Sequence, residues 1–142
     1  MVKILFVCHG NICRSPMAEF VMKDMVKKAG LQDRFYIDSA AASREEIGNP
    51  IYPPAQRELR KHGITDASHR ARQITAADLE NFDRIYYMDS RNRTYLQLLF
   101  PTYAKFLPFL PYDVADPWYS GDFTQTWEDI EKGCSRILEE LK

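Results

Sequence analysis

The chain has 142 residues, the usual size of one domain and enough to bury a core. Hydrophobic residues make up 45% and charged residues 27%, a balance typical of a folded globular chain and not of a disordered one. The formal net charge of −1 gives no basic surface for nucleic acid or an anionic membrane. The apolar run over residues 4 to 8 is too short for a signal peptide or a membrane span. We therefore expect one cytoplasmic domain over residues 1–142.

The predicted elements begin with a buried strand over residues 2 to 7, because this segment is short, apolar and partly β-branched. A loop containing Gly10 follows. A helix comes next, for which Ser15 is a good N-cap and Pro16 a good first residue. Gly30 is placed to end this helix.

The middle of the chain continues the alternation of strand and helix. We expect a second strand over residues 35 to 39 and a helix over residues 53 to 62 that ends at Gly63. Thr75 begins a short helix as its cap, with Asp78 three residues later as a weaker partner than Glu would be.

The last part of the chain supplies two more strands. We expect these over residues 84 to 88 and 105 to 107, separated by a helix that Ser90 caps, and followed by a proline-rich loop over residues 108 to 117. A final helix has an apolar stripe, formed by Trp127, Ile130, Cys134, Ile137, Leu138 and Leu141. Strands that alternate with helices predict a single α/β domain, with a parallel sheet and helices on both faces.

A Cys-x5-Arg-Ser pattern occupies the junction between the first strand and the first helix. In such sheets the working site lies beyond the carboxyl ends of the strands, where Cys8 falls. Backbone N–H groups before a helix form a cradle for phosphate oxygens, and we expect this one from His9, Gly10, Asn11, Ile12, Cys13 and Arg14. Gly10 is expected to take unusual dihedral angles that let the cradle close.

The chemistry of the pattern suits phosphoryl transfer. A helix N-terminus and a nearby guanidinium lower a cysteine pKa to about 3.5–7.5 in known cases, which makes Cys8 the expected nucleophile. Arg14 can hold two phosphoryl oxygens as a planar fork. Ser15 can either cap the helix or turn its hydroxyl hydrogen toward the Cys8 sulfur.

A phosphatase also needs an acid to protonate the leaving group. Asp116 is the best candidate, because it precedes Pro117 in a loop beside Trp118 and Tyr119, which can desolvate it and offer an apolar wall to an aryl group. An ordinary exposed turn aspartate is the alternative interpretation, and Asp113 is the rival acid.

The remaining cysteines and the histidines indicate no metal site. The three cysteines at positions 8, 13 and 134 include no Cys-x-x-Cys, and the three histidines form no zinc-type pair. An odd number of cysteines fits a reducing compartment better than a disulfide framework. We therefore expect neither a metal nor a cofactor.

These motifs together resemble the low-molecular-weight protein tyrosine phosphatase family. Its pattern Val-Cys-x-Gly-Asn-x-Cys-Arg-Ser-Pro-Met-Ala-Glu is matched without a break by residues 7 to 19, and its Asp-Pro with two aromatics by residues 116 to 119. Residues 37 to 41, 69 to 75 and 82 to 89 are also similar to the family. The resemblance implies a four-stranded parallel sheet flanked by helices. It also implies hydrolysis of phosphotyrosine and small aryl phosphates through a phosphocysteine.

The resemblance assigns roles residue by residue. Cys8 would be the nucleophile, Arg14 the phosphate clamp, and Asp116 the general acid and then the general base. Cys13 matches a second loop cysteine that in some members forms a reversible disulfide with the nucleophile. A hydrogen-bond network supporting the loop would consist of Asn11, Ser15, Ser39 and His69. Without the resemblance, His69 would be interpreted as a surface or capping histidine.

The chain departs from the family after Ser43, where Trp or Tyr usually lines the pocket entrance and this chain has Glu45. A carboxylate does not stack on a substrate ring and repels phosphate dianions and acidic peptides. We expect a substrate wall of Trp118, Tyr119 and Glu45, and a bias toward peptides with basic residues near the phosphotyrosine.

Other functions compete with this one. An arsenate reductase of the same fold needs further redox cysteines past the loop, but Cys134 lies on the apolar stripe of the last helix. A cysteine-phosphorylated sugar-phosphotransferase carrier has no use for Asp116-Pro117 beside aromatics. The intact set of Cys8, Arg14 and Asp116 argues against an adaptor without turnover. The expected partner is a phosphotyrosine protein, such as a tyrosine kinase or its targets, with no nucleic acid or membrane partner. The expected assembly is a monomer or a weak dimer.

Overall fold

Four parallel strands form the centre of the computed structural model, which describes residues Met1–Lys142. Their order across the sheet is β2-β1-β3-β4, and each neighbouring pair runs parallel. The strands are β1 (Val2–Cys8), β2 (Phe35–Ala41), β3 (Arg84–Tyr87) and β4 (Phe106–Pro108). Each lies within two residues of its prediction, so the predicted α/β fold with a four-stranded parallel sheet is confirmed.

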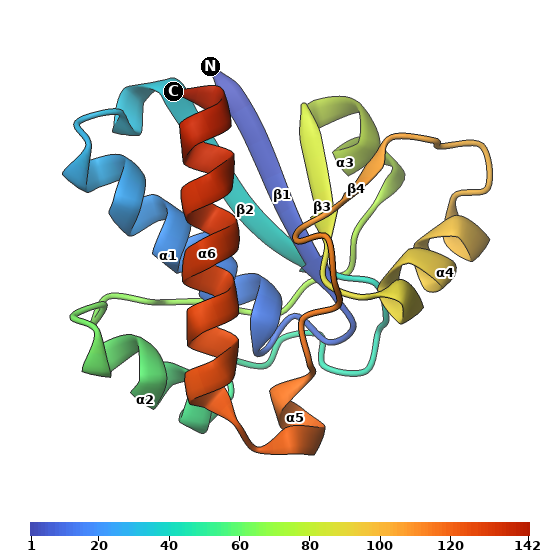
Figure 1. The fold of residues 1–142 in the computed structure, drawn as a ribbon. Helices are drawn as coiled ribbons and strands as arrows, with labels where there is room; N and C mark the ends of the chain where they lie inside the picture. Colours follow the sequence, from blue (N-terminus) through green and yellow to red (C-terminus); the bar gives the residue numbers. More distant parts are fainter.

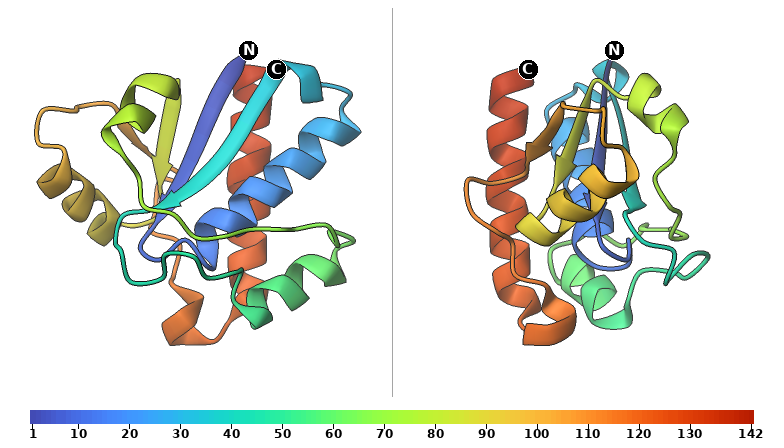
Figure 2. Two further views of the ribbon diagram at one scale, coloured as in Figure 1. Left: turned by 180° about the vertical axis from the view of Figure 1, so that it is seen from behind. Right: turned by 90° about the vertical axis from the view of Figure 1, so that its right-hand side faces the viewer.

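Helices cover both faces of this sheet (Figures 1 and 2). The helical elements are α1 (Arg14–Lys28), the single 3-10 turn η1 (Gln32–Arg34), α2 (Pro53–Lys61), α3 (Ala76–Asn81), α4 (Ser90–Leu99), α5 (Pro117–Ser120) and α6 (Phe123–Leu141). The helices α1 and α6 lie on one face, and α3 lies on the other, as the edge-on view of Figure 2 shows. No helix is both long enough and apolar enough to span a bilayer.

The side chains of β1 point alternately to two hydrophobic clusters, as expected for a central strand of a parallel sheet. Ile4 and Phe6 belong to the larger cluster, which also includes the apolar stripe of α6. Leu5 and Val7 belong to the smaller cluster, which includes Leu96 of α4. Both faces of β1 are therefore buried, and its carboxyl end is held rigidly where Cys8 stands.

A glycine allows α6 to pack closely on the segment that follows β4. A methyl group on Gly133 would overlap the ring of Phe109, well inside van der Waals contact. Phe109 in turn meets Phe6 of β1 edge to face, with ring centroids 5.6 Å apart. The position of α6 over the sheet therefore depends on the absence of a side chain at residue 133.

The starts of two helices differ from the prediction. Ser15 is not the N-cap of α1, because the helix begins at Arg14 and the Ser15 hydroxyl contacts Cys8 instead. Ser90 is the first residue of α4, and Asp89 is its cap, with a side chain that accepts a hydrogen bond from the N–H of Asn92.

Two other helix starts also bear on the predictions. The Thr75 capping box with Asp78 is present, as predicted. Residues 117 to 120, which begin at the end of the predicted loop and were assigned no helix, form the short helix α5. The Asp116 side chain accepts a hydrogen bond from the N–H of Trp118 in its first turn.

Candidate active site

The loop between β1 and α1 forms the floor of a pocket at the carboxyl edge of the sheet. Five of the six predicted loop residues line it, and Asn11 is the exception because its side chain is fully buried behind the loop. The pocket is lined by Cys8, His9, Gly10, Ile12, Cys13, Arg14, Glu45, Glu46, Asp116, Trp118 and Tyr119. All three residues of the predicted substrate wall are therefore beside the predicted nucleophile.

The unusual backbone conformation in this loop belongs to Asn11, and the prediction for Gly10 was wrong. Asn11 has a φ of 61°, in the left-handed region, whereas Gly10 is not among the residues with positive φ. Asparagine tolerates this region because its short polar side chain can hydrogen-bond locally. At Gly10 the constraint is space, because a Cβ there would lie 3.3 Å from Cγ of Glu46.

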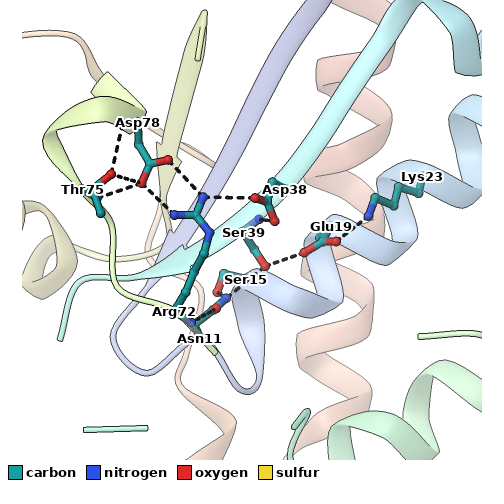
Figure 3. A network of polar contacts seen from close by, with 9 residues as sticks. All are labelled: Asn11, Ser15, Glu19, Lys23, Asp38, Ser39, Arg72, Thr75 and Asp78. Carbon is teal, nitrogen blue, oxygen red and sulfur yellow. Dashed lines mark hydrogen bonds and ion pairs between the residues drawn. The ribbon is translucent and has the colours of Figure 1, made fainter. Parts of the chain in front are cut away.

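Hydrogen bonds fix Asn11 in this conformation. Its Nδ2 donates to Ser15 Oγ at 2.8 Å and to Ser39 Oγ at 3.0 Å, and its Oδ1 accepts from the Arg72 N–H at 3.1 Å. His69 Nε2 is 2.8 Å from the Asn11 carbonyl, which can only accept. The structure therefore joins Asn11, Ser15, Ser39 and His69 behind the loop, and Figure 3 shows the part formed by the first three.

The network continues into residues that the sequence reasoning missed (Figure 3). Ser39 Oγ donates to Glu19 Oε1 at 2.6 Å, and Glu19 Oε2 accepts from Lys23 Nζ at 2.6 Å. Ser15 and Glu19 are four residues apart, so they share one face of α1. This four-residue spacing was the sequence signal that could have placed Glu19 beside the predicted network.

Arg72 anchors the other side of the network and was also missed. Its guanidinium is 2.8 Å from Asp78 and 3.1 Å from Asp38. Burial acts to lower the pKa of Arg72, but the hydrogen bonds and charges of these two carboxylates outweigh burial and raise it. Arg72 therefore remains charged and holds the segment whose N–H contacts Asn11.

Cys8 is almost fully buried, and its sulfur has two potential donors from the start of α1. Sγ is 3.0 Å from Ser15 Oγ and 3.4 Å from the Ser15 N–H. Because Asn11 Nδ2 donates to Ser15 Oγ, the hydroxyl hydrogen of Ser15 is free to point at the sulfur. The supporting network thus leaves the Ser15 hydroxyl available as a donor to the Cys8 sulfur.

Arg14 is buried and held by groups from distant segments. Its Nη1 donates to Asp89 Oδ2 at 2.6 Å and to the Val114 carbonyl at 2.8 Å, and Nη2 is 3.4 Å from Asp116 Oδ2. Burial acts to lower the pKa of Arg14, but the charges of Cys8, Asp116 and Asp89 raise it. Sequence reasoning missed Asp89, which lies two residues past the end of β3, at the edge of the sheet where sites of this fold occur.

The two candidate acids occupy different places. Asp113 accepts hydrogen bonds from the N–H and the hydroxyl of Ser90, at 3.1 and 3.0 Å, and does not line the pocket that contains Cys8. Asp116 lines that pocket, and its Oδ1 accepts from the N–H of Trp118 at 3.0 Å. Of the two aspartates, only Asp116 lines the pocket that contains the Cys8 sulfur.

The wall of the pocket combines aromatic and acidic side chains. The ring of Trp118 packs on Tyr52, with centroids 4.7 Å apart, and the Tyr52 N–H donates to the Ile12 carbonyl of the loop at 2.9 Å. On the other side, Glu45 Oε2 is 3.0 Å from His9 Nε2. Tyr52 is a further residue that the sequence reasoning did not identify.

The other two cysteines are buried free thiols. Burial raises the pKa of Cys13 far above its ordinary value, and the charge of Cys8 raises it further. Cys134 lies on the buried face of α6, where burial alone raises its pKa strongly. No group of three or more His, Cys, Asp or Glu side chains is arranged to hold a metal ion.

Three groups meet in this small pocket: a thiol with two hydrogen-bond donors beside it, a buried guanidinium and a carboxylic acid. Together they define the class of cysteine-dependent phosphatases. The family model described as "Low molecular weight phosphotyrosine protein phosphatase" matches residues 3–142. A low molecular weight protein-tyrosine-phosphatase of Bacillus subtilis, YfkJ, is 38% identical, over 100% of this chain and 97% of its own. The low molecular weight phosphotyrosine protein phosphatase of Gallus gallus is 39% identical, over 96% and 93%.

Solved structures agree with these sequence relatives. The crystal structure of SP-PTP, a low molecular weight protein tyrosine phosphatase from Streptococcus pyogenes, superposes with a TM-score of 0.93 at 42% identity, covering 100% of this chain and 94% of the other. The chain therefore belongs to the low-molecular-weight phosphotyrosine protein phosphatase family. The predicted family and the predicted hydrolase class are confirmed.

Proposed function

We propose that the chain hydrolyses phosphotyrosine through a phosphocysteine on Cys8, with Arg14 as the phosphate clamp and Asp116 as the acid and base. The observation that supports these roles is the convergence of all three side chains on one pocket at the end of β1. Residues 1–142 would act as one phosphatase domain, since both hydrophobic clusters join early and late parts of the chain.

In the first step the Cys8 thiolate attacks the phosphorus of phosphotyrosine. The S–P bond forms as the P–O bond to tyrosine breaks, and Asp116 gives its proton to the departing phenolic oxygen. Both hydrogens of Arg14 Nη1 are engaged by Asp89 and Val114, and one Nη2 hydrogen is directed at Asp116. The Nε hydrogen and the second Nη2 hydrogen therefore remain to hold two phosphoryl oxygens.

In the second step water attacks the phosphocysteine. The ionised Asp116 takes a proton from the water as its oxygen bonds to phosphorus, and the S–P bond breaks to restore the thiolate. The donors from Ser15 stabilise sulfur as a leaving group in this step, just as they stabilise it as a nucleophile in the first.

Phosphate release from phosphotyrosine and p-nitrophenyl phosphate, with arsenate reduction measured in parallel, tests the proposal against its rivals. We expect repeated turnover of both esters and no arsenate reduction, because Cys134 is buried in the core and away from the pocket. Arsenate reduction without ester turnover would indicate the reductase. A single stoichiometric transfer without phosphate release would indicate a phosphocarrier.

We propose tyrosine-phosphorylated cytoplasmic proteins, such as a tyrosine kinase or its targets, as the substrates. Three free thiols support a reducing compartment. The residues assigned to both steps come from one chain, which supports a monomer or a weak dimer as the active form.

A further inference from the structure

The mouth of the active-site pocket is acidic on the side formed by residues 45 and 46. Glu45 and Glu46 both line the pocket, and 68% of the Glu45 side chain is exposed. No lysine lines the pocket, and its one arginine, Arg14, is buried between the carboxylates of Asp89 and Asp116. An approaching substrate therefore meets two carboxylates on this side, neither of them paired with a lysine or arginine, before it reaches the phosphate-binding loop.

Both carboxylates are held in place. Glu45 Oε2 is 3.0 Å from His9 Nε2, and the His9 ring packs edge to face on Tyr95 at 5.9 Å. Glu46 Oε2 accepts a hydrogen bond from Asn49 Nδ2 at 2.6 Å. Groups that are already ordered lose little conformational entropy when a partner binds.

The backbone that carries Glu45 is attached to the phosphate-binding loop. The N–H and the hydroxyl of Ser43 both donate to the His9 carbonyl, at 3.0 and 2.8 Å, and the Glu45 N–H donates to Ser43 Oγ at 3.4 Å. The acidic side of the mouth therefore keeps a fixed position relative to the phosphate held by the loop.

We infer that Glu45 and Glu46 form a binding surface for a lysine or arginine side chain close in sequence to the phosphotyrosine. This inference rests on the proposed function. A phosphate dianion that approaches two carboxylates is repelled, and a substrate cation beside the phosphate removes that repulsion and pairs with the carboxylates. Two exposed ion pairs correspond to a kcat/KM that is about threefold to tenfold higher for a basic substrate than for an acidic one.

The adjoining cleft differs because arginines lie among its carboxylates. It is lined by Asp89, Asp113 and Asp116 together with Arg14 and Arg91, so most of its negative charge is offset. The basic substrate residue is therefore assigned to the side of Glu45 and Glu46.

The test uses two phosphotyrosyl peptides that differ only in having lysine or glutamate on both sides of the phosphotyrosine. Their kcat/KM ratio is measured for the wild-type enzyme at about 0.05 M and 0.5 M salt, where screening lengths differ severalfold. The variant Glu45→Gln/Glu46→Gln is compared with Glu80→Gln/Glu131→Gln, which removes the same charge from exposed positions outside the pocket. Thermal melting verifies that each variant is folded.

We expect the wild type and the Glu80→Gln/Glu131→Gln control to favour the lysine peptide at low salt, and the preference to shrink at high salt. Glu45→Gln/Glu46→Gln should bring the ratio close to one. Equal rates for the two peptides in the wild type, or a ratio that both double variants lower alike, would overturn the inference and leave the phosphatase activity standing. If the Glu45→Gln/Glu46→Gln variant does not fold, the salt dependence of the wild-type kcat/KM ratio still tests the inference. Failure to hydrolyse p-nitrophenyl phosphate and either peptide would reject the proposed function itself.

Discussion

Arg14 Nη1 lies 2.6 Å from Asp89 Oδ2, a contact between residues 75 positions apart in the sequence. Arg14 begins α1 after the first strand, and Asp89 caps α4 after the third. Because β1 and β3 are neighbours in the sheet, their carboxyl ends bring the two side chains together. The sheet order thus sets the orientation of the guanidinium in the pocket.

Replacement of Asp89 tests this relationship. Asparagine caps a helix about as well as aspartate, so Asp89→Asn should keep α4 while it loses the charge-assisted bond to Arg14. A hydrogen bond to a charged group contributes about 1.5–3 kcal/mol, so we expect kcat/KM for p-nitrophenyl phosphate to fall about 10- to 100-fold. Asp113→Asn, in the same cleft but without contact to Arg14, should change it little. Equal effects of the two variants would show that the pairing with Arg14 has no catalytic importance.

The role of Asp116 is tested by the leaving group. The phenol of tyrosine has a pKa of about 10 and needs a proton, whereas p-nitrophenolate leaves with little help. Asp116→Asn should therefore slow phosphotyrosine hydrolysis about 100- to 10,000-fold and slow the formation of phosphoenzyme from p-nitrophenyl phosphate much less. Burst kinetics across a series of aryl phosphates measures this. A loss that does not depend on the leaving group would assign the acid to another residue.

Cys13 is expected to protect Cys8 from irreversible oxidation. Peroxide oxidises a thiolate first, and a neighbouring thiol can capture the sulfenic acid as a disulfide. Burial and the charge of Cys8 raise the pKa of Cys13, so Cys13 stays a thiol at neutral pH and is itself a poor target for peroxide. Activity recovered by dithiothreitol after peroxide should be lower for Cys13→Ser than for the wild type, and unchanged for Cys134→Ala. Full recovery of Cys13→Ser would rule out the protective disulfide.

The contact between Gly133 and Phe109 predicts an unusual stability effect. Gly→Ala inside a helix normally stabilises it by about 1 kcal/mol. Here the new methyl group would overlap the Phe109 ring, and overpacking of a core costs about 1–3 kcal/mol. Gly133→Ala should therefore lower the free energy of unfolding in urea, and Phe109→Leu in the same chain should restore part of the loss. A stabilised Gly133→Ala would show that α6 moves away at little cost.

Local patterns were sufficient for much of the fold. The strands are short apolar segments bounded by turn residues, and Gly30 and Gly63 follow their helices with φ of 71° and 86°, as helix-ending glycines do. The N-cap prediction for Ser15 failed because a local rule competed with a tertiary contact, and the alternative prediction, a contact between its hydroxyl and the Cys8 sulfur, matches the structure. Ser15 has the chemistry of an N-cap, but its hydroxyl is used by Cys8 and Asn11.

The candidate site was predictable to the extent that it is continuous in sequence. The loop from Cys8 to Arg14 is one segment, and its chemistry follows from the spacing of a cysteine and an arginine around a helix start. Asp89 and Arg72 were missed because they reach the site only through the order of the strands and the packing of distant segments, which local periodicity does not determine. Glu19 shares a helix face with Ser15, but its hydrogen bond to Ser39 depends on how α1 packs against β2.

In the proposed mechanism the phosphoryl group is transferred to the sulfur of Cys8 before it is transferred to water. The most direct measurement mixes Asp116→Asn with p-nitrophenyl phosphate, quenches the reaction in neutral denaturant within one turnover, and maps the phosphoryl group by mass spectrometry of peptides. The variant lacks the base for hydrolysis but loses little with this leaving group, so the intermediate should accumulate. The phosphoryl group should be found on Cys8, and it should be absent when Cys8→Ser is added. A phosphoryl group on another residue, or turnover by Cys8→Ser, would contradict the mechanism.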